Sequence, residues 1–193
     1  MKKLFAVISV LILPAWALQA QTLALNVQSS SQNLSVTTSG DLNFGNNLMN
    51  NQGPVSIPLN SPNTVVVSIT GDERCAVDIS VTRPPGNALS INGSSDQIPF
   101  TLKAAYANDG QDDTAQANTF IDNNNSPTST TFRIEQQGNS NKPPWAGPKC
   151  RGGSPGSDKL STAYVYIYGD ITIGNIRAGT YTGNINLNVQ YAD

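Results

Sequence analysis

The sequence contains no histidine among its 193 residues, and only 12% of those residues are charged. The absence of histidine removes the commonest general base and the commonest metal ligand of proteins. A His-based catalytic triad, a zinc-hydrolase site and a His-ligated haem are therefore excluded. A charged fraction of about half the usual quarter is atypical of helical proteins with salt-bridged surfaces. We accordingly expect a structural or binding protein, with no enzymatic activity, no cofactor and no metal site.

Amides, hydroxyls and turn-forming residues take the place of the missing charges. The sequence has 22 Asn, 16 Gly and 12 Pro, together with abundant Ser and Thr. These residues are poor in helix interiors and good in turns and on the wet faces of strands. Apolar residues recur with a period of two through most of the chain, as in half-buried strands. We therefore predict an all-β fold, an immunoglobulin-like antiparallel β-sandwich of about eight to ten short strands.

Long hydrophobic runs are also absent, apart from one short run at the start. Two lysines precede the apolar run Leu4–Leu13, and small residues follow it up to Ala20. This arrangement is typical of a signal peptide, and the run is too short for a transmembrane helix of about 20 residues. We expect cleavage after Ala20 and export, through the periplasm to the cell surface, to a fimbrium or to the medium.

Cysteine is scarce, and basic residues are not clustered. Cys75 and Cys150 are the two cysteines, and in an exported protein they are a natural disulfide pair. The bridge would close a loop of about 75 residues and contribute about 4 kcal/mol. Without the signal peptide the formal net charge falls from −2 to −4, so nucleic acid is not an expected partner.

The remaining chain is divided into two parts. Residues 21–39 form an N-terminal strand segment, in which Leu23, Leu25 and Val27 alternate with polar or small residues. Residues 40–193 form the sandwich domain, which contains a long Gly/Pro-rich loop at 136–159. Loops of this length in compact domains are usually functional, disordered or stapled.

Glycine and aspartate mark predicted breaks between strands. Gly71-Asp72 is expected to turn the chain after the β-branched run 64–70, and Gly169-Asp170 to interrupt the strand that starts near Ala163. The last strand is the clearest, because four apolar residues share one face opposite Asn and Gln: Ile185, Leu187, Val189 and Tyr191.

Two polar motifs have chemical alternatives. Asp109, Asp112 and Asp113 supply carboxylates that could bind calcium, but their spacing does not fit the calcium-loop pattern, and a solvated acidic loop is favoured. The G-x-S-x-G match at 152–156 lacks a usable N–H because Pro155 follows the serine, and no histidine accompanies it. We interpret this match as chance.

Aromatic residues leave one binding alternative open. Trp145 and the tyrosines at 164, 166 and 168 could form a platform for a saccharide. Tyrosines on one face of a strand more often cover the neighbouring sheet surface or a subunit interface. A carbohydrate-binding adhesin therefore stays an alternative, with host or surface glycans as partners.

Both ends of the exported chain resemble known bacterial proteins. Asp41-Leu42-Asn43-Phe44-Gly45 resembles the L-x-F-G element of an exported domain-of-unknown-function family that is similar to fimbrial subunits. The segment 178–191, with Gly179 before an alternating strand and Tyr191 near its end, resembles the last strand of chaperone–usher pilus subunits, including the spore-coat-U-like branch. The resemblance covers about 10 residues at the front and 16 at the back. The mid-chain positions of the two cysteines depart from the usual pilin disulfide.

The resemblance implies assembly by strand complementation. A sandwich that lacks one strand exposes an apolar groove, which another chain fills with an extended segment. By this resemblance, the donor strand carries Leu23, Leu25 and Val27, and the acceptor groove is lined by the C-terminal strand: Gly179, Ile185, Leu187, Val189 and Tyr191. The implied partners are other copies or related subunits, a periplasmic chaperone and an outer-membrane usher.

The same N-terminal residues allow a simpler interpretation. Alternation does not distinguish a donor strand from a first strand that pairs within its own domain. A self-contained, secreted or surface sandwich that does not polymerise is therefore the main alternative to a pilus-like subunit.

Overall fold

A computed structural model describes residues 21–31, 33–46, 48–73, 75–135 and 160–192. The predicted signal peptide at 1–20 and the whole predicted loop at 136–159, with Cys150, lie outside the described residues. The described chain consists of strands and two short 3₁₀ turns, so the all-β prediction is confirmed.

The strands range in length from two residues to 14. In chain order they are β1 (Gln21–Ser29), β2 (Ser35–Thr38), β3 (Leu42–Asn43), β4 (Gly53–Ile57), β5 (Val65–Asp72), β6 (Ala76–Thr82), β7 (Ala88–Ser90), β8 (Gln97–Ala107), β9 (Asn118–Ile121), β10 (Ser129–Arg133), β11 (Leu160–Ile173) and β12 (Tyr181–Tyr191). The two turns are η1 (Pro85–Asn87) and η2 (Thr114–Gln116).

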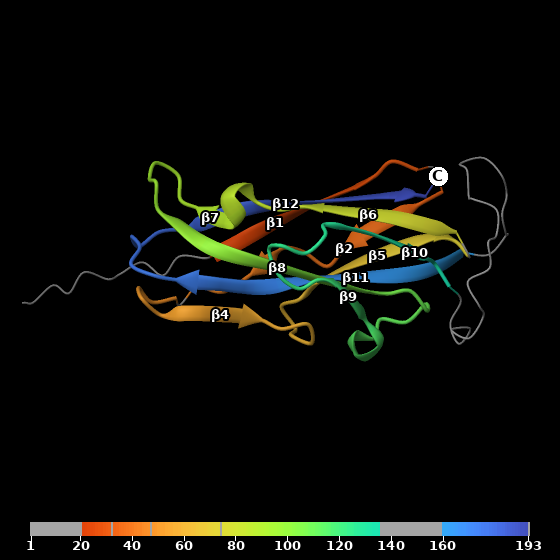
Figure 1. Ribbon diagram of the computed structural model, residues 1–193, viewed down its shortest axis with the longest axis horizontal. Coiled ribbons are helices and arrows are strands. Elements are labelled where there is room, and N and C mark those ends of the chain that lie inside the picture. Colours follow the sequence, from red (N-terminus) through yellow and green to blue (C-terminus); the bar gives the residue numbers. More distant parts are fainter. Residues whose placement is uncertain (1–20, 32, 47, 74, 136–159, 193) are drawn as a thin grey trace, which may run out of the picture.

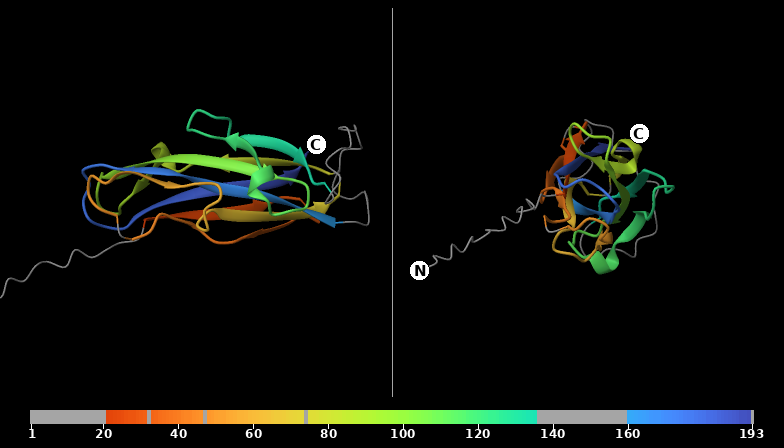
Figure 2. Two further views of the ribbon diagram at one scale, coloured as in Figure 1. Left: turned by 90° about the horizontal axis from the view of Figure 1, so that it is seen from below. Right: turned by 90° about the vertical axis from the view of Figure 1, so that its left-hand side faces the viewer.

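The strands form two layers that run along the length of an elongated molecule (Figures 1 and 2). The first layer has the order β3-β1-β12-β6-β10. The second has the order β2-β5-β11-β8-β9. Strand β4 pairs with the last part of β11, on the same edge of β11 as β5. Strand β7 pairs with both β12 and β8, so it joins the two layers at one end. The predicted β-sandwich is therefore confirmed.

The core lies between the layers and is built by alternation along the strands. The central strands place every second residue inside: Val77, Ile79 and Val81 in β6, Ala163, Val165 and Ile167 in β11, and Ile185, Leu187, Val189 and Tyr191 in β12. Aromatic rings of the two layers also meet, because Tyr106 in β8 stacks on Phe132 in β10 with ring centroids 4.3 Å apart. The apolar faces that the sequence pattern predicts are the faces that the fold buries.

One predicted break is wrong, because β11 runs through Gly169 from Leu160 to Ile173. The predicted turn after the preceding β-branched run is confirmed, since β5 ends at Asp72, whose carbonyl accepts the Cys75 N–H at 3.2 Å. Gly71 and Gly169 each allow a close approach to a neighbouring group. A Cβ on Gly169 would lie 2.2 Å from the carbonyl oxygen of Thr101, and one on Gly71 would lie 2.7 Å from Tyr191 Oη. Glycine inside a strand often has this role.

Candidate strand-pairing site

Strand β1 lies along one edge of β12 over its full length (Figure 1). Residues Gln21–Ser29 pair in parallel with residues 181–189, in one unbroken register. Among the pairings of the described strands this is the one that is parallel. The sequence therefore predicted the two strands at this site but not their direction relative to each other.

The apolar side chains of β1 enter the core beside those of β12. Leu23 is fully buried, Leu25 is 8% exposed, and Val27 packs against the core from a half-buried position. In register, Leu25 pairs with Ile185 and Val27 with Leu187. The residues predicted for a donor strand and for its acceptor groove are therefore in contact within one chain.

Gly183 makes room for the first of these side chains. It stands opposite Leu23 in the register, and a Cβ at this position would lie 2.8 Å from Leu23 Cδ2. The leucine thus occupies the space that a side chain of β12 would otherwise fill. A slip by one residue would turn every β1 side chain to the other face, and a slip by two would separate Leu23 from Gly183.

Gln21 anchors the start of β1 with both its backbone and its side chain. Its N–H donates to the Gly45 carbonyl and its carbonyl accepts from the Phe44 N–H, both at 3.0 Å. The side-chain amide donates to the Gly179 carbonyl at 3.1 Å and accepts from the Tyr181 N–H at 2.9 Å. Because Gln21 is only 5% exposed, these bonds satisfy polar groups that would otherwise be costly to bury.

The other edge of β1 has fewer partners. Strand β3 pairs with only two residues of β1, and Asp41 Oδ1 then accepts the Leu25 N–H at 3.0 Å. Asp41 and Phe44 belong to the segment in which the L-x-F-G resemblance was found. That segment therefore covers the first half of β1, and β12 supplies the long pairing edge.

Tyr191 closes the far end of the site. Its hydroxyl accepts the Asp72 N–H at 2.9 Å and donates to the Asn33 carbonyl at 3.3 Å, while its own N–H donates to Ser31 Oγ at 2.9 Å. Burial raises the pKa of Tyr191, although the hydrogen bond from the Asp72 N–H acts to lower it. The last residue of β12 thereby ties together β5 and the connection that follows β1.

Gly179, the last predicted groove residue, lies just before β12. Its carbonyl accepts the Gln21 amide, and a Cβ on it would lie 2.1 Å from Ile91 Cδ1. The sequence did not predict the roles of Gln21, Asp41 and Gly183 at this site. A glycine inside an otherwise alternating strand is a signal of close approach, whereas nothing local predicts the hydrogen bonds of Gln21 and Asp41 to distant segments.

The pairing seen in one chain corresponds to the simpler of the two interpretations of the N-terminal strand. The place beside β12 is filled by the chain's own β1. Exchange of β1 between chains stays a prediction, and so do the donor and acceptor roles of the residues above.

Cys75 is buried in the core at 1% exposure and is not a free cysteine. Its predicted partner Cys150 lies outside the described residues, so the bridge between them stays a prediction.

The three acidic residues at 109–113 each accept a hydrogen bond from a different donor. Asp109 accepts the Gln111 N–H, Asp113 caps η2 through the Ala115 N–H, and Asp112 accepts the Tyr166 hydroxyl at 2.9 Å. In the part of the chain that the structure describes, no group of three His, Cys, Asp or Glu residues is placed to hold a metal ion.

The tyrosines of the proposed saccharide platform are largely covered. Tyr166 is fully buried and Tyr168 is 8% exposed, and Tyr164 packs against the core. Trp145 lies outside the described residues. The two buried rings therefore have no free face for a ligand.

Comparison with known proteins adds little to this geometry. Across the described ranges, no helix is long and apolar enough to span a membrane. No protein-family model matches the chain, and no curated protein matches it. A similar solved structure is CpGH89CBM32-6 produced by Clostridium perfringens, 11% identical over 85% of this chain and 96% of that one, with a TM-score of 0.26. A likeness at so low a TM-score supports no argument about what this chain does.

Proposed function

We propose that this chain is a non-enzymatic structural subunit of a bacterial surface appendage, of the pilus or fimbria type, which polymerises by strand complementation. The observation that carries the proposal is the parallel pairing of β1 with β12 along nine residues. In the polymer, β1 of one copy occupies the place beside β12 of the next copy.

The energy of this pairing is large enough to hold subunits together. Burial of Leu23, Leu25 and Val27 contributes about 1.5–3 kcal/mol for each fully buried side chain. Each main-chain hydrogen bond adds about 0.5–1.5 kcal/mol. The total is several kcal/mol, comparable with the stability of a small domain. A chain with nothing beside β12 is therefore unstable, and a strand of the same sequence from another copy restores the same contacts.

The topology makes such an exchange simple. Strand β1 is the first described element, and the short connection between Ser30 and Leu34 joins it to β2. It can leave the sandwich without threading through any loop, as in domain swapping between identical chains. Before assembly, an unfilled edge of β12 needs temporary protection, which a periplasmic chaperone supplies before an outer-membrane usher adds the subunit to the fibre.

Pairs of variants that each carry one added cysteine beside Cys75 and Cys150 test the exchange directly. Ala24 and Asn184 are register partners with side chains on the outer face, at a separation that a disulfide can span. One population carries Ala24→Cys and the other carries Asn184→Cys. After mixing and oxidation, we expect a cross-link between chains, seen as a dimer on a non-reducing gel.

The matched control moves one cysteine along the strand. Gln28→Cys mixed with Asn184→Cys is displaced by four residues, roughly 13 Å at strand spacing, so it should give no dimer. A cross-link that forms only inside the double variant Ala24→Cys/Asn184→Cys, and never between chains, would reject polymerisation. A dimer from the displaced pair alone would reject the parallel register.

The second candidate function is a self-contained surface or secreted sandwich. The pairing of β1 within its own chain favours it. For this function, deletion of residues 21–31 should unfold the monomer, and native material should run as one band near the monomer mass without heating. A ladder of bands that collapses on boiling would instead support the polymer.

A further inference from the structure

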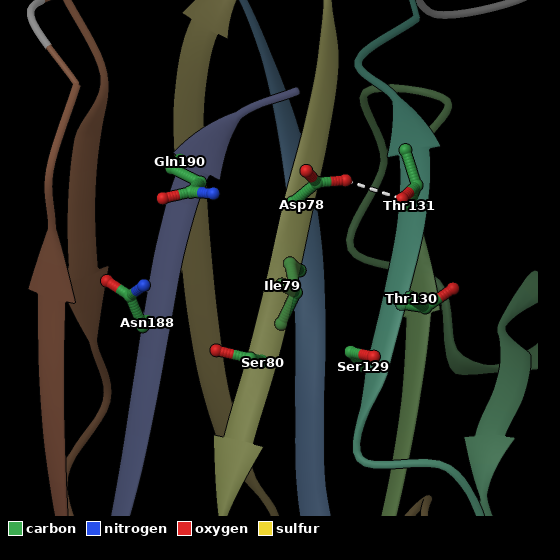
Figure 3. A pocket seen from close by; sticks show the side chains of 8 residues that line it. All are labelled: Asp78, Ile79, Ser80, Ser129, Thr130, Thr131, Asn188 and Gln190. Atoms are coloured by element: carbon green, nitrogen blue, oxygen red, sulfur yellow. Dashed lines mark hydrogen bonds between the residues drawn. The ribbon is translucent and has the colours of Figure 1, made fainter. Parts of the chain in front are cut away.

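The outer face of the first layer carries a shallow depression of about 390 Å³ over β6, β10 and β12 (Figure 3). Because Val77, Ile79 and Val81 of β6 point into the core, the residues between them point outward to this face. Six outward side chains surround the depression, and Ile79 and Thr130 complete its lining; the six are Asp78, Ser80, Ser129, Thr131, Asn188 and Gln190.

The shape of the depression follows from the strand register. Asn188, Ser80 and Ser129 are neighbours in one row across the three strands. Gln190, Asp78 and Thr131 form the next row, in which every side chain is larger than serine. The two small serines therefore make the hollow, and the larger side chains rim it (Figure 3). The rows are about 7 Å apart along the strands, and the strands are about 4.8 Å apart.

The chemistry of the six side chains is unusual for a site of this size. None carries a positive charge, none is aromatic, and Asp78 is the one ionisable group among them. Anionic ligands such as phosphates and nucleic acids find no cation here, and an apolar ligand finds no apolar side chain among the six. Hydroxyls and amides both donate and accept hydrogen bonds, which matches a ligand whose groups do the same.

Asp78 is held in place before any ligand arrives. Its Oδ1 accepts a hydrogen bond of 2.5 Å from Thr131 Oγ1 (Figure 3). Gln190 Oε1 likewise accepts the Ser30 hydroxyl at 3.4 Å. Groups fixed in this way lose little side-chain entropy on binding.

We propose that this depression binds a neutral saccharide chain. A carboxylate fixed at one side accepts hydrogen bonds from ligand hydroxyls, while the amides and serine hydroxyls bond to the remaining ones. A volume of about 390 Å³ lies at the small end of ligand pockets, enough for about one sugar ring with its neighbours along the open face. Because binding uses hydrogen bonds and no aromatic stacking, the affinity for one short oligosaccharide is weak, with a Kd of about 1 mM.

This site is independent of strand exchange. It uses β6, β10 and β12, which stay in the domain whether β1 comes from the same chain or from another. The proposed polymer would repeat the site once in every subunit and raise its avidity for a long polysaccharide. Failure of either proposal therefore leaves the other standing.

The test is a titration of the exported chain with neutral hexasaccharides of glucose, mannose and galactose, followed by ligand-observed NMR. We expect at least one of them to bind. Asp78→Asn, which keeps the shape of the side chain, should weaken that binding at least fivefold, and Ser80→Leu, which fills the hollow, should abolish it. Asn184→Ala is the matched control, because Asn184 is exposed on the same face of β12 but does not line the depression.

Three outcomes would overturn the proposal. The first is that no hexasaccharide binds. The second is that Asp78→Asn and Ser80→Leu bind as well as Asn184→Ala does. The third is a concentration-dependent dimer in sedimentation that Ser80→Leu abolishes while no sugar binds, since this face would then belong to a second copy. Asp78→Asn keeps the test decisive if Ser80→Leu does not fold.

Discussion

A single missing side chain, at Gly183, determines how deeply β1 sits against β12. The place of its Cβ lies 2.8 Å from Leu23 Cδ2 and 3.4 Å from Pro84 Cβ. Any side chain there must displace Leu23, which is fully buried, and the strand that carries it.

Gly183→Val should therefore destabilise the protein by about 1–3 kcal/mol, the usual cost of overpacking. The free energy of unfolding from urea titration measures the effect. Asn184→Val, one residue along on the exposed face, should change it by no more than about 0.5 kcal/mol. Equal free energies for Gly183→Val and the unchanged chain would show that β1 does not depend on this contact.

A second residue-scale prediction concerns alkaline pH. Burial raises the pKa of Tyr166 above its ordinary value of 10.0, and the hydrogen bond to Asp112 raises it further. The folded state therefore holds this proton more tightly than the unfolded state. The resulting stability is fully present below a pH of about 10 and is lost as the pH rises beyond it.

The measurement compares urea midpoints at a pH of about 8 and about 11, on either side of the tyrosine range. The unchanged chain should lose stability between the two, and Tyr166→Phe should lose less because it has no hydroxyl to ionise. An identical loss in both proteins would mean that Tyr166 keeps its ordinary pKa in the fold.

At the scale of the element, alternation predicted which faces of the strands are buried but not which strands meet. The buried face of β12, with Ile185, Leu187 and Val189, follows from period two alone. The pairing of β12 with β1 does not follow from this pattern, because β1 lies 160 residues earlier in the chain. Gln21 and Asp41 were missed for the same reason, since their hydrogen bonds exist only after distant segments have come together.

The glycines at 71 and 169 show the limit of local turn signals. Glycine followed by aspartate is a common turn pair, yet Gly169-Asp170 lies inside β11, whereas a turn does begin at Asp72 after β5. Glycine is required at these positions by a close neighbour, which is Tyr191 Oη for Gly71 and the Thr101 carbonyl oxygen for Gly169. Neither neighbour can be located from the residues beside the glycine in sequence.

Leu187→Asp tests the face assignment of β12. Leu187 is 1% exposed in the core, so a carboxylate there would be buried without a partner and should cost about 4 kcal/mol or more. We expect loss of the folded signal in circular dichroism, or of cross-linking between chains where folding survives. Asn184→Asp on the exposed face should leave both intact, and equal damage from the two variants would refute the assigned faces.

For the whole molecule, composition and the period-two alternation together were enough to predict the architecture. Few charges, many amides and alternating strands led to a β-sandwich, and the structure has two layers around one core. The parallel pair β1–β12 lay beyond such reasoning, because strand direction depends on where the chain ends meet the sheet. The depression over β6, β10 and β12 also could not be predicted from the sequence, because its side chains come from three strands that are distant in the chain.

The predicted bridge between Cys75 and Cys150 belongs to this scale as well. Mass analysis after alkylation, with and without reduction, should find no free thiol in the native protein. Reduction should lower the free energy of unfolding by about 4 kcal/mol, because it releases a loop of about 75 residues in the unfolded chain. Two alkylated thiols in the native protein would exclude the bridge.

The parallel arrangement of β1 and β12 also determines how the molecule resists being pulled. Gln21 begins β1 at the end of the sandwich where Tyr181 begins β12, and Tyr191 ends β12 at the opposite end (Figure 1). A force applied between Gln21 and Tyr191 therefore slides the two strands past each other, and it loads all their main-chain bonds together. An antiparallel pair pulled from one end would unzip one bond at a time. A single chain pulled between these two residues should therefore rupture slowly under a load that opens an unzipping pair quickly.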